Sequence, residues 1–184
     1  MNKYIKNSVM VGMGFFQNIW TKIFHFSTYC GSSLLLVSPS SEVTLERGGI
    51  LKLGRRAKLC KNSSLRIRKG AECTIGAGAS IGDGCIVTCH EKITIGKDTL
   101  LSPYVLVYDH DHDFKSKGYV LKRKYNTAPI VIGNNVWIGA NTIILKGTVI
   151  GDNCVVGAGA VLSGTYPKGS IIVQKRETSV HTLK

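Results

Sequence analysis

The stretch IVIGNNVWIGANTIILKGTVIGDNCVVGAGAVLS, residues 130–163, places an aliphatic residue at every sixth position. These aliphatic positions are Ile132, Ile138, Ile144, Ile150, Val156 and Leu162. A second series of small or β-branched residues follows the first five of them by four places: Val136, Thr142, Thr148, Cys154 and Ala160. A helix would rotate every sixth residue around its surface, so a period of six does not fit a helix.

A short strand followed by a tight corner repeats naturally after six residues and turns both series inward. The same six-residue period occurs upstream, at Leu53, Leu59 and Leu65, at Ile75, Ile81, Val87 and Ile93, and at Ile95, Leu101 and Val107. Stacked units of this kind bury one continuous apolar column. Glycine after the aliphatic residue, as at Gly133 and Gly139, is interpreted as a corner that needs unusual dihedral angles. The sequence therefore predicts an all-β fold, a parallel β-helix of hexapeptide repeats.

Composition and charge narrow the class of protein and its partners. With 184 residues, 43% hydrophobic and 19% charged, the chain is expected to be globular rather than disordered. A formal charge of +13 favours an anionic partner. The basic segment 53–70 could attract an acidic polysaccharide, a lipid-linked precursor or a bilayer, whereas nucleic acid is not expected because no aromatic residues are interleaved with it. The six cysteines show no disulfide pattern, which favours free thiols and a cytoplasmic location.

The chain divides into three parts by pattern. Residues 1–33 are expected to form a capping segment, with a helix whose apolar positions are Ile5, Val9, Met13, Phe16, Trp20 and Phe24. Attachment of this segment to a membrane surface, at the inner face of the membrane, is the alternative. Residues 34–173 are expected to form the β-helix domain, and residues 174–184 a polar tail.

The beat stops between Val107 and Ile132, which are 25 positions apart instead of six, so about nineteen residues are expected to leave the coil. This excursion, residues 108–129, is polar and contains YDHDHDF. A polar insertion in a regular solenoid is usually functional or disordered. A solvated loop and a metal site are alternatives, but an extended segment 109–113 would put its histidines on one face and its aspartates on the other. Because the potential ligands of segment 109–113 lie on opposite faces, we expect no metal site there. We expect none at CIVTCH (85–90) either, because no second ligand pair lies at a suitable distance in the sequence.

Residues 130–163 resemble the C-terminal half of the hexapeptide-repeat acyltransferases, closest to the maltose, galactoside and polysaccharide O-acetyltransferases. IGKDTLLSPYVLVYDHDHDF (95–114) aligns without gaps to the segment that leads to that family's catalytic histidine, and the resemblance covers residues 70–165. It implies a left-handed β-helix, a homotrimer, and transfer of an acetyl group from acetyl-CoA to a hydroxyl.

The ungapped match implies that His112 is the catalytic residue, with His110 as the alternative. Histidine can accept the proton of a weakly nucleophilic sugar hydroxyl as the oxygen attacks the thioester. A carboxylate, either Asp111 or Asp113, could hold the imidazole in the useful tautomer. No cysteine is needed as a nucleophile.

Further residues follow from the same resemblance or from charge. Trp137 precedes the inward Ile138, so its ring is expected to point outward toward a neighbouring subunit or a ligand, and its family match lies beside the active site. The backbone at Ala140 is implied to contact the thioester. The remaining candidates for CoA binding are Ala158, Ser163 and Gly164 by match, and Lys146, Lys168, Lys175 and Arg176 by charge.

The acceptor positions depart from the galactoside pattern. His90 and Gly82 stand where galactoside-type relatives carry an aspartate and an asparagine, and the C-terminus lacks the family's proline-containing ending. We therefore expect an acetyl-CoA-dependent O-acetyltransferase for a sugar of a surface polysaccharide or its precursor, rather than for a simple galactoside or maltose. A hexapeptide transferase with another acceptor (serine, an amino sugar, a nucleotide sugar or an antibiotic) and a non-enzymatic scaffold are the alternatives. His112, the excursion and NNVWIGA (134–140) together favour the enzyme.

Overall fold

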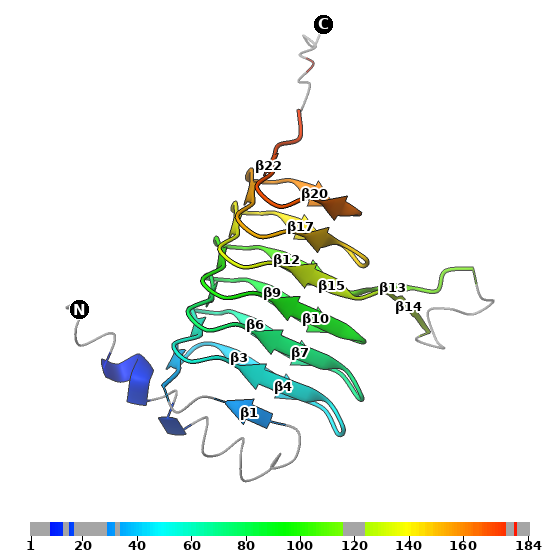
Figure 1. The fold of residues 1–184 in the computed structure, drawn as a ribbon. Helices are drawn as coiled ribbons and strands as arrows, with labels where there is room; N and C mark the ends of the chain where they lie inside the picture. The colour runs from blue at the N-terminus through cyan, green and yellow to red at the C-terminus, as the bar shows by residue number, and fades with distance from the viewer. Residues whose placement is uncertain are drawn as a thin grey trace, which may run out of the picture.

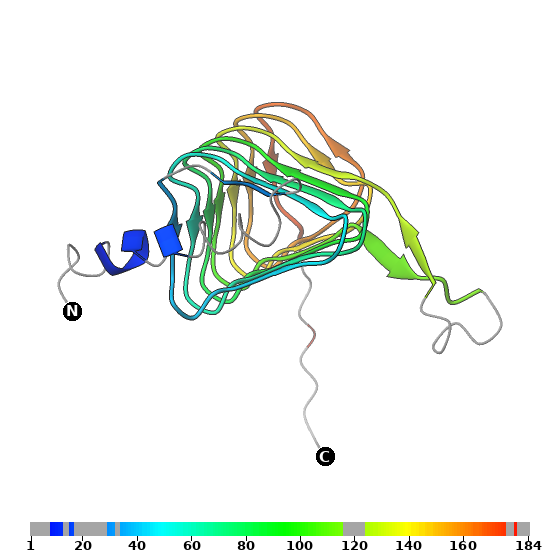
Figure 2. The same ribbon diagram turned by 90° about the horizontal axis from the view of Figure 1, so that it is seen from below.

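The chain winds into a stack of coils with three flat sides (Figures 1 and 2). The structure, a computed structural model, describes residues 8–12, 15–16, 29–31, 34–115, 124–175 and 179. Each coil contributes one short strand to each of three parallel sheets, which we name A, B and C in the order in which the chain visits them. The predicted parallel β-helix is confirmed.

Strands recur in a fixed order through the stack. Sheet A contains β1 (Tyr29–Gly31), β4 (Ile50–Leu53), β7 (Glu72–Ile75), β10 (Lys92–Ile95), β15 (Ile130–Ile132), β18 (Val149–Ile150) and β21 (Thr165–Tyr166). Sheet B contains β2 (Leu36–Val37), β5 (Lys58–Leu59), β8 (Ser80–Ile81), β11 (Leu100–Leu101), β16 (Trp137–Ile138), β19 (Val155–Val156) and β22 (Ile171–Ile172). Sheet C contains β3 (Glu42–Leu45), β6 (Ser64–Ile67), β9 (Ile86–Cys89), β12 (Leu106–Tyr108), β17 (Ile143–Ile144) and β20 (Val161–Leu162).

The pairing register measures the insertion. Leu100 pairs with Trp137, 37 positions later, whereas Trp137 pairs with Val155, 18 positions later. The difference, 37 − 18, is nineteen residues, the number that the six-residue beat predicts. These residues leave at the corner between sheets C and A and form a hairpin of β13 (His110–His112) and β14 (Tyr125–Thr127), which projects from one corner of the column in Figure 2.

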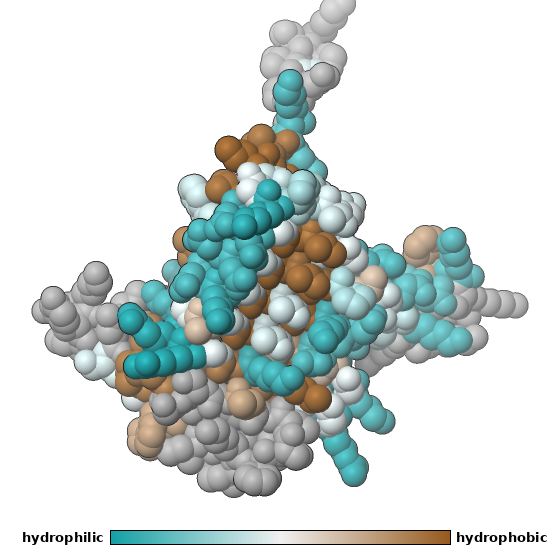
Figure 3. All heavy atoms as spheres, in the orientation of Figure 1, coloured by the Kyte–Doolittle hydropathy of each residue, from teal (hydrophilic) through white to brown (hydrophobic). Residues whose placement is uncertain are grey.

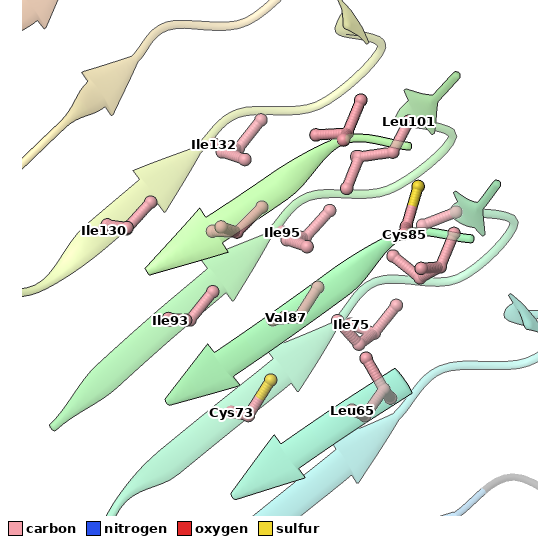
Figure 4. Close-up of a cluster of buried hydrophobic side chains, with 14 of the residues drawn as sticks. Leu65, Cys73, Ile75, Cys85, Val87, Ile93, Ile95, Leu101, Ile130 and Ile132 are labelled. Atoms are coloured by element: carbon pink, nitrogen blue, oxygen red, sulfur yellow. The ribbon is translucent and has the colours of Figure 1, made fainter. Parts of the chain in front are cut away.

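The core continues across the insertion without a break. Ile93 pairs with Ile130 and Ile95 with Ile132, so the aliphatic column of sheet A keeps its register on both sides of the excursion (Figure 4). Every position of the two sequence series in residues 132–162 is buried, including the polar Thr142. Burial of a side chain of this size contributes about 1.5–3 kcal/mol to folding, so the repeated columns supply the main driving force.

The glycines that follow the aliphatic residues have a different reason from the one expected. Gly133 and Gly139 do not have the positive φ of a corner; that conformation falls two residues later, at Asn135 (53°) and Asn141 (57°). A Cβ at Gly139 would lie 2.5 Å from the backbone nitrogen of Ala158 in the next coil. Glycine is needed there because successive coils approach closely, and asparagine or glycine supplies the left-handed residue.

The N-terminal region differs from the expectation in detail. Residues 8–12 and 15–16 are helical, but Met10 is the buried residue, whereas Val9 and Phe16 of the expected apolar stripe are exposed. The stripe's other members lie outside the described residues. Strand β1 pairs with β4, so sheet A begins ahead of the boundary expected at residue 34. Among the described residues, no helix is long and apolar enough to cross a bilayer.

Candidate active site

A buried carboxylate anchors the excursion to the column. Asp109 is fully buried, and its side-chain oxygens accept hydrogen bonds from the backbone N–H groups of His90 (2.8 Å), Glu91 (2.8 Å) and Lys92 (3.0 Å). Its backbone carbonyl accepts from the N–H of Ala128 at 2.9 Å, which ties the two ends of the excursion together. The Asp109 carboxylate therefore satisfies backbone N–H donors at the corner of the coil below. The backbone carbonyl of the same residue joins the two ends of the hairpin at its base, or neck.

The charge of Asp109 is stabilised in place. Burial by itself raises the pKa of this carboxyl, but hydrogen bonds from His110 and from the backbone outweigh burial and hold the pKa below its usual value. The Nδ1 atom of His110 lies 3.4 Å from an Asp109 oxygen. Asp109 is thus ionised at neutral pH and orients the first histidine of the hairpin.

Three histidines gather around one tyrosine at the root of the hairpin. His110 stacks on His90, with ring centroids 3.8 Å apart. Tyr125, on the returning strand, pairs with His112 in the hairpin register and lies 4.9 Å from its ring. The Tyr125 ring also lies 4.3 Å from His90. The two hairpin histidines therefore share one face of β13, as expected for an extended segment.

The histidines differ in burial, and burial changes the pKa of His90. Burial and the nearby His110 imidazole lower the pKa of His90 to about 4, so His90 is neutral near pH 7. The His110 side chain is 13% exposed, whereas His112 is exposed. His112 is thus the more exposed of the two hairpin histidines.

The two carboxylates expected to support His112 are placed differently. Asp111 alternates to the opposite face of β13 and pairs with Lys146, whose Nζ lies 3.5 Å from its carboxylate. The N–H of Asp113 donates to the carbonyl of Lys124 at 2.9 Å, across the hairpin. Within one chain, the Asp111 carboxylate is therefore the ion-pair partner of Lys146.

The remaining predicted residues lie at different corners of the column. Lys146, Ser163 and Gly164 lie at the C–A corner, in the coils that follow the excursion; Ala140, Ala158 and Gly82 lie at the B–C corner; and Lys168 lies at the A–B corner. Lys175 follows β22, and Arg176 lies outside the described residues. Sheet C separates the B–C corner from the hairpin. A single chain therefore brings His112 near Lys146 but does not bring it to Ala140.

Trp137 begins an apolar column on the outside of sheet B. Its ring is 54% exposed, as strand alternation predicts, and its Nε1–H donates to the Ser102 hydroxyl at 3.0 Å. Leu100, Val155 and Ile171 lie in register with it on the same face. On the face drawn in Figure 3, apolar residues also gather in a band along the column, between hydrophilic ones. A band of this kind on a regular sheet marks a surface for association.

Four of the six thiols, those of Cys73, Cys85, Cys89 and Cys154, are buried in the core, whereas Cys60 is half-buried and Cys30 is exposed. Burial raises the pKa of Cys85 to about 11 and of Cys73 to about 12, so neither is a thiolate at neutral pH. CIVTCH is divided between the interior, where Cys85 and Cys89 are buried, and the corner, where His90 lies. No group of three or more potential ligands is arranged for a metal ion in the part of the chain that the structure describes.

Sequence reasoning missed Asp109 and Tyr125. In the sequence Asp109 is one of several polar residues in DHDHD, and only its position two residues after the inward Val107, where strand alternation points inward again, marks it as different. Tyr125 comes next to His112 because the excursion folds back as a hairpin. The sequence between the two strands carries no register signal that would reveal this pairing.

Comparison with known proteins supports the hexapeptide repeat. The family model "Bacterial transferase hexapeptide (six repeats)" matches residues 129–164. A protein of Escherichia coli (strain K12) assigned to O-acetyl transfer in lipopolysaccharide biosynthesis is 35% identical over 100 residues, which is 50% of this chain and 51% of that protein. The chain thus spans about half the length of the curated relatives that it matches.

Solved structures share the fold. A maltose O-acetyltransferase from Clostridium difficile 630 has a TM-score of 0.57 and 30% identity, over 69% of this chain and 65% of that one. A point mutant of AntD, an N-acyltransferase from Bacillus cereus solved in complex with dTDP and coenzyme A, has a TM-score of 0.67 and 20% identity, over 81% and 79% of the two chains. The second likeness concerns the fold alone.

We predict that Asp109→Asn loosens the neck of the hairpin. An amide has one acceptor atom, and its NH2 group would face backbone N–H donors, so the loss of charged hydrogen bonds should cost about 3 kcal/mol of stability. Amide exchange at His90, Glu91 and Lys92 should accelerate by at least about tenfold. Asp111→Asn, which removes an exposed carboxylate of the same hairpin, is the control; equal exchange rates in the two variants would contradict the anchor role.

The lowered pKa of His90 predicts a pH dependence of stability. The folded-state value of about 4 lies below the ordinary value of 6.5, so the unfolded chain takes up the proton first as the pH falls. The contribution of neutral His90 to the free energy of unfolding is fully present above pH 6.5 and is lost as the pH falls toward 4. The free energy of unfolding, measured by denaturation across this pH range, should depend less on pH in His90→Gln than in the wild type or in His112→Gln. Identical slopes in all three proteins would count against a neutral His90.

Proposed function

We propose that the chain, which is similar to hexapeptide-repeat acetyltransferases, is an acetyl-CoA-dependent O-acetyltransferase for a sugar of a surface polysaccharide or its precursor. The observation that carries the proposal is the exposed imidazole of His112, held on a hairpin whose neck is locked by Asp109. Acetyl-CoA is a cytoplasmic metabolite, so the proposal includes a cytoplasmic location.

The proposed reaction is a direct transfer. The hydroxyl oxygen of the acceptor attacks the carbonyl carbon of the thioester while His112 takes the hydroxyl proton. The tetrahedral intermediate then collapses, the carbon–sulfur bond breaks, and the imidazolium returns the proton to the leaving thiolate. The products are a sugar acetate ester and free CoA. Buried thiols of high pKa, such as Cys85, agree with a route that needs no acyl-enzyme.

The B–C corner supplies the complementary half of the site. The carbonyl of Ala140 accepts from Gly159 at 2.7 Å, but the N–H of Ala140 has no partner among the described residues. This N–H is available to stabilise the oxyanion of the tetrahedral intermediate. Because His112 and Ala140 lie at different corners, the proposed site forms between two copies of the chain. A ring of three copies would place every C–A corner against a B–C corner and cover the apolar column at Trp137.

The proposed CoA contacts follow this arrangement. Ala158 lies beside Ala140 at the B–C corner of one copy, and Ser163 and Gly164 lie at the C–A corner of its neighbour. Lys168, in the last complete coil, is the proposed partner of a CoA phosphate. Lys146 would then hold Asp111 beside the thioester rather than bind a phosphate, because it is already paired in the single chain.

We predict that His112→Ala lowers the turnover of acetyl transfer by about 10²- to 10⁴-fold, as for loss of a general base. The fold should survive because this side chain is exposed, and an unchanged melting temperature would show it. Turnover is followed by thiol release from acetyl-CoA with a panel of glycan acceptors. His110→Gln is the matched variant: a full rate in His112→Ala, or a larger loss in His110→Gln, would overturn the assignment.

A further inference from the structure

A cleft lies beside the histidine cluster, at the C–A corners of the coils below the excursion. It has a volume of about 320 Å³ and is lined by Glu46, Arg68, Lys69, His90 and Tyr125. Glu46, Arg68 and His90 occupy equivalent places in three successive coils, because the residues just before them pair in register on sheet C. The cleft is therefore a feature of the column itself, and the hairpin contributes Tyr125 as its upper wall.

The charges of this cleft are not balanced. Arg68 donates through Nη1 to Glu46 at 2.7 Å, and the backbone N–H of Lys69 donates to the other Glu46 oxygen at 3.1 Å, so the one carboxylate of the cleft is fully engaged. The ammonium group of Lys69 has no carboxylate partner among the described residues. His90 is neutral and adds no charge.

Arg68 also retains an unused donor. Its Nε–H is buried and has no hydrogen-bond partner within the part of the chain that the structure describes. A buried donor without a partner is costly, and native structures usually satisfy such groups with a protein atom, water or ligand. Guanidinium and ammonium donors together favour an oxyanion.

The cleft is connected to His112 by one side chain. Tyr125 contacts His90 in the cleft on one side, at 4.3 Å between ring centroids, and His112 on the other, at 4.9 Å. A sugar ring that packs against Tyr125 can therefore reach His112 with one hydroxyl while a substituent enters the cleft. Aromatic rings commonly provide such an apolar face beside a few polar groups in ligand sites.

We propose that this cleft binds a carboxylate or phosphate group of the acceptor, so that the enzyme acts on acidic glycans. The inference rests on the proposed function and narrows its acceptor class. Lys69 and Arg68 hold the anionic group, Tyr125 supports the sugar ring, and His112 receives the hydroxyl proton. The engaged Glu46 keeps the guanidinium in place rather than neutralising Lys69.

Binding without acetyl-CoA tests the cleft independently of catalysis. Calorimetry or NMR titration compares glucose, glucuronate and glucose 1-phosphate on the wild-type protein, on Lys69→Met and on Lys97→Met. Lys97 is exposed at the A–B corner, away from sheet C, and controls for the loss of one positive charge. Glucuronate or glucose 1-phosphate should bind at least tenfold more tightly than glucose, and Lys69→Met alone should remove the difference. The preferred anion identifies a carboxylate or a phosphate as the recognised group.

Acetyl transfer to acidic and neutral oligosaccharides gives the second arm. For an acidic acceptor, kcat/KM should fall by about 10- to 100-fold in Lys69→Met and stay unchanged for a neutral acceptor. Transfer to neutral acceptors with no effect of Lys69→Met on either arm would overturn the cleft assignment and leave the proposed function intact. Anion binding that depends on Lys69, in a protein that transfers acetyl to no acceptor, would support the cleft and contradict the proposed function.

Discussion

The register of the stacked aliphatic residues across the excursion is the constraint on which the rest of the structure depends. Ile93 pairs with Ile130 and Ile95 with Ile132 although nineteen additional residues separate the coils. Shifting a strand by one residue would turn its apolar side chains outward, so the buried column holds both ends of the excursion at one corner. The rigid column thereby determines where the hairpin begins, and the hairpin determines where the imidazole of His112 lies.

Local polar contacts then fix the direction in which the hairpin leaves the column. Asp109 binds three backbone N–H groups of the coil below and one imidazole, and its carbonyl binds the returning strand. Tyr125 then packs among the histidines from that strand. The same corner exposes one histidine and keeps another neutral, and places an unbalanced pair of cations next to them. Catalysis and acceptor choice would thus depend on a single stack of corners.

The column could be predicted from the sequence because its signal is local and repeated. Each aliphatic position implies its own burial, the missing beat gives the length of the excursion, and alternation places Trp137 outside. Contacts made by single residues across long distances could not be predicted in this way. Asp109 is important because it meets the corner at His90, and Tyr125 because the hairpin folds back on His112. The glycines were recognised but misread: the neighbouring coil at Ala158, not the dihedral angle, excludes a side chain at Gly139.

The central claim is that the hairpin of one copy completes the B–C corner of another. Its most direct test mixes two inactive variants, His112→Ala and Ala140→Leu, by refolding them together and measuring thiol release from acetyl-CoA. In a closed ring assembled at random from the two variants, a site is intact where a hairpin with His112 meets a B–C corner with Ala140. This pairing occurs at about one quarter of the sites, so about one quarter of the wild-type activity should return. Mixed oligomers that remain as inactive as either parent would contradict the account.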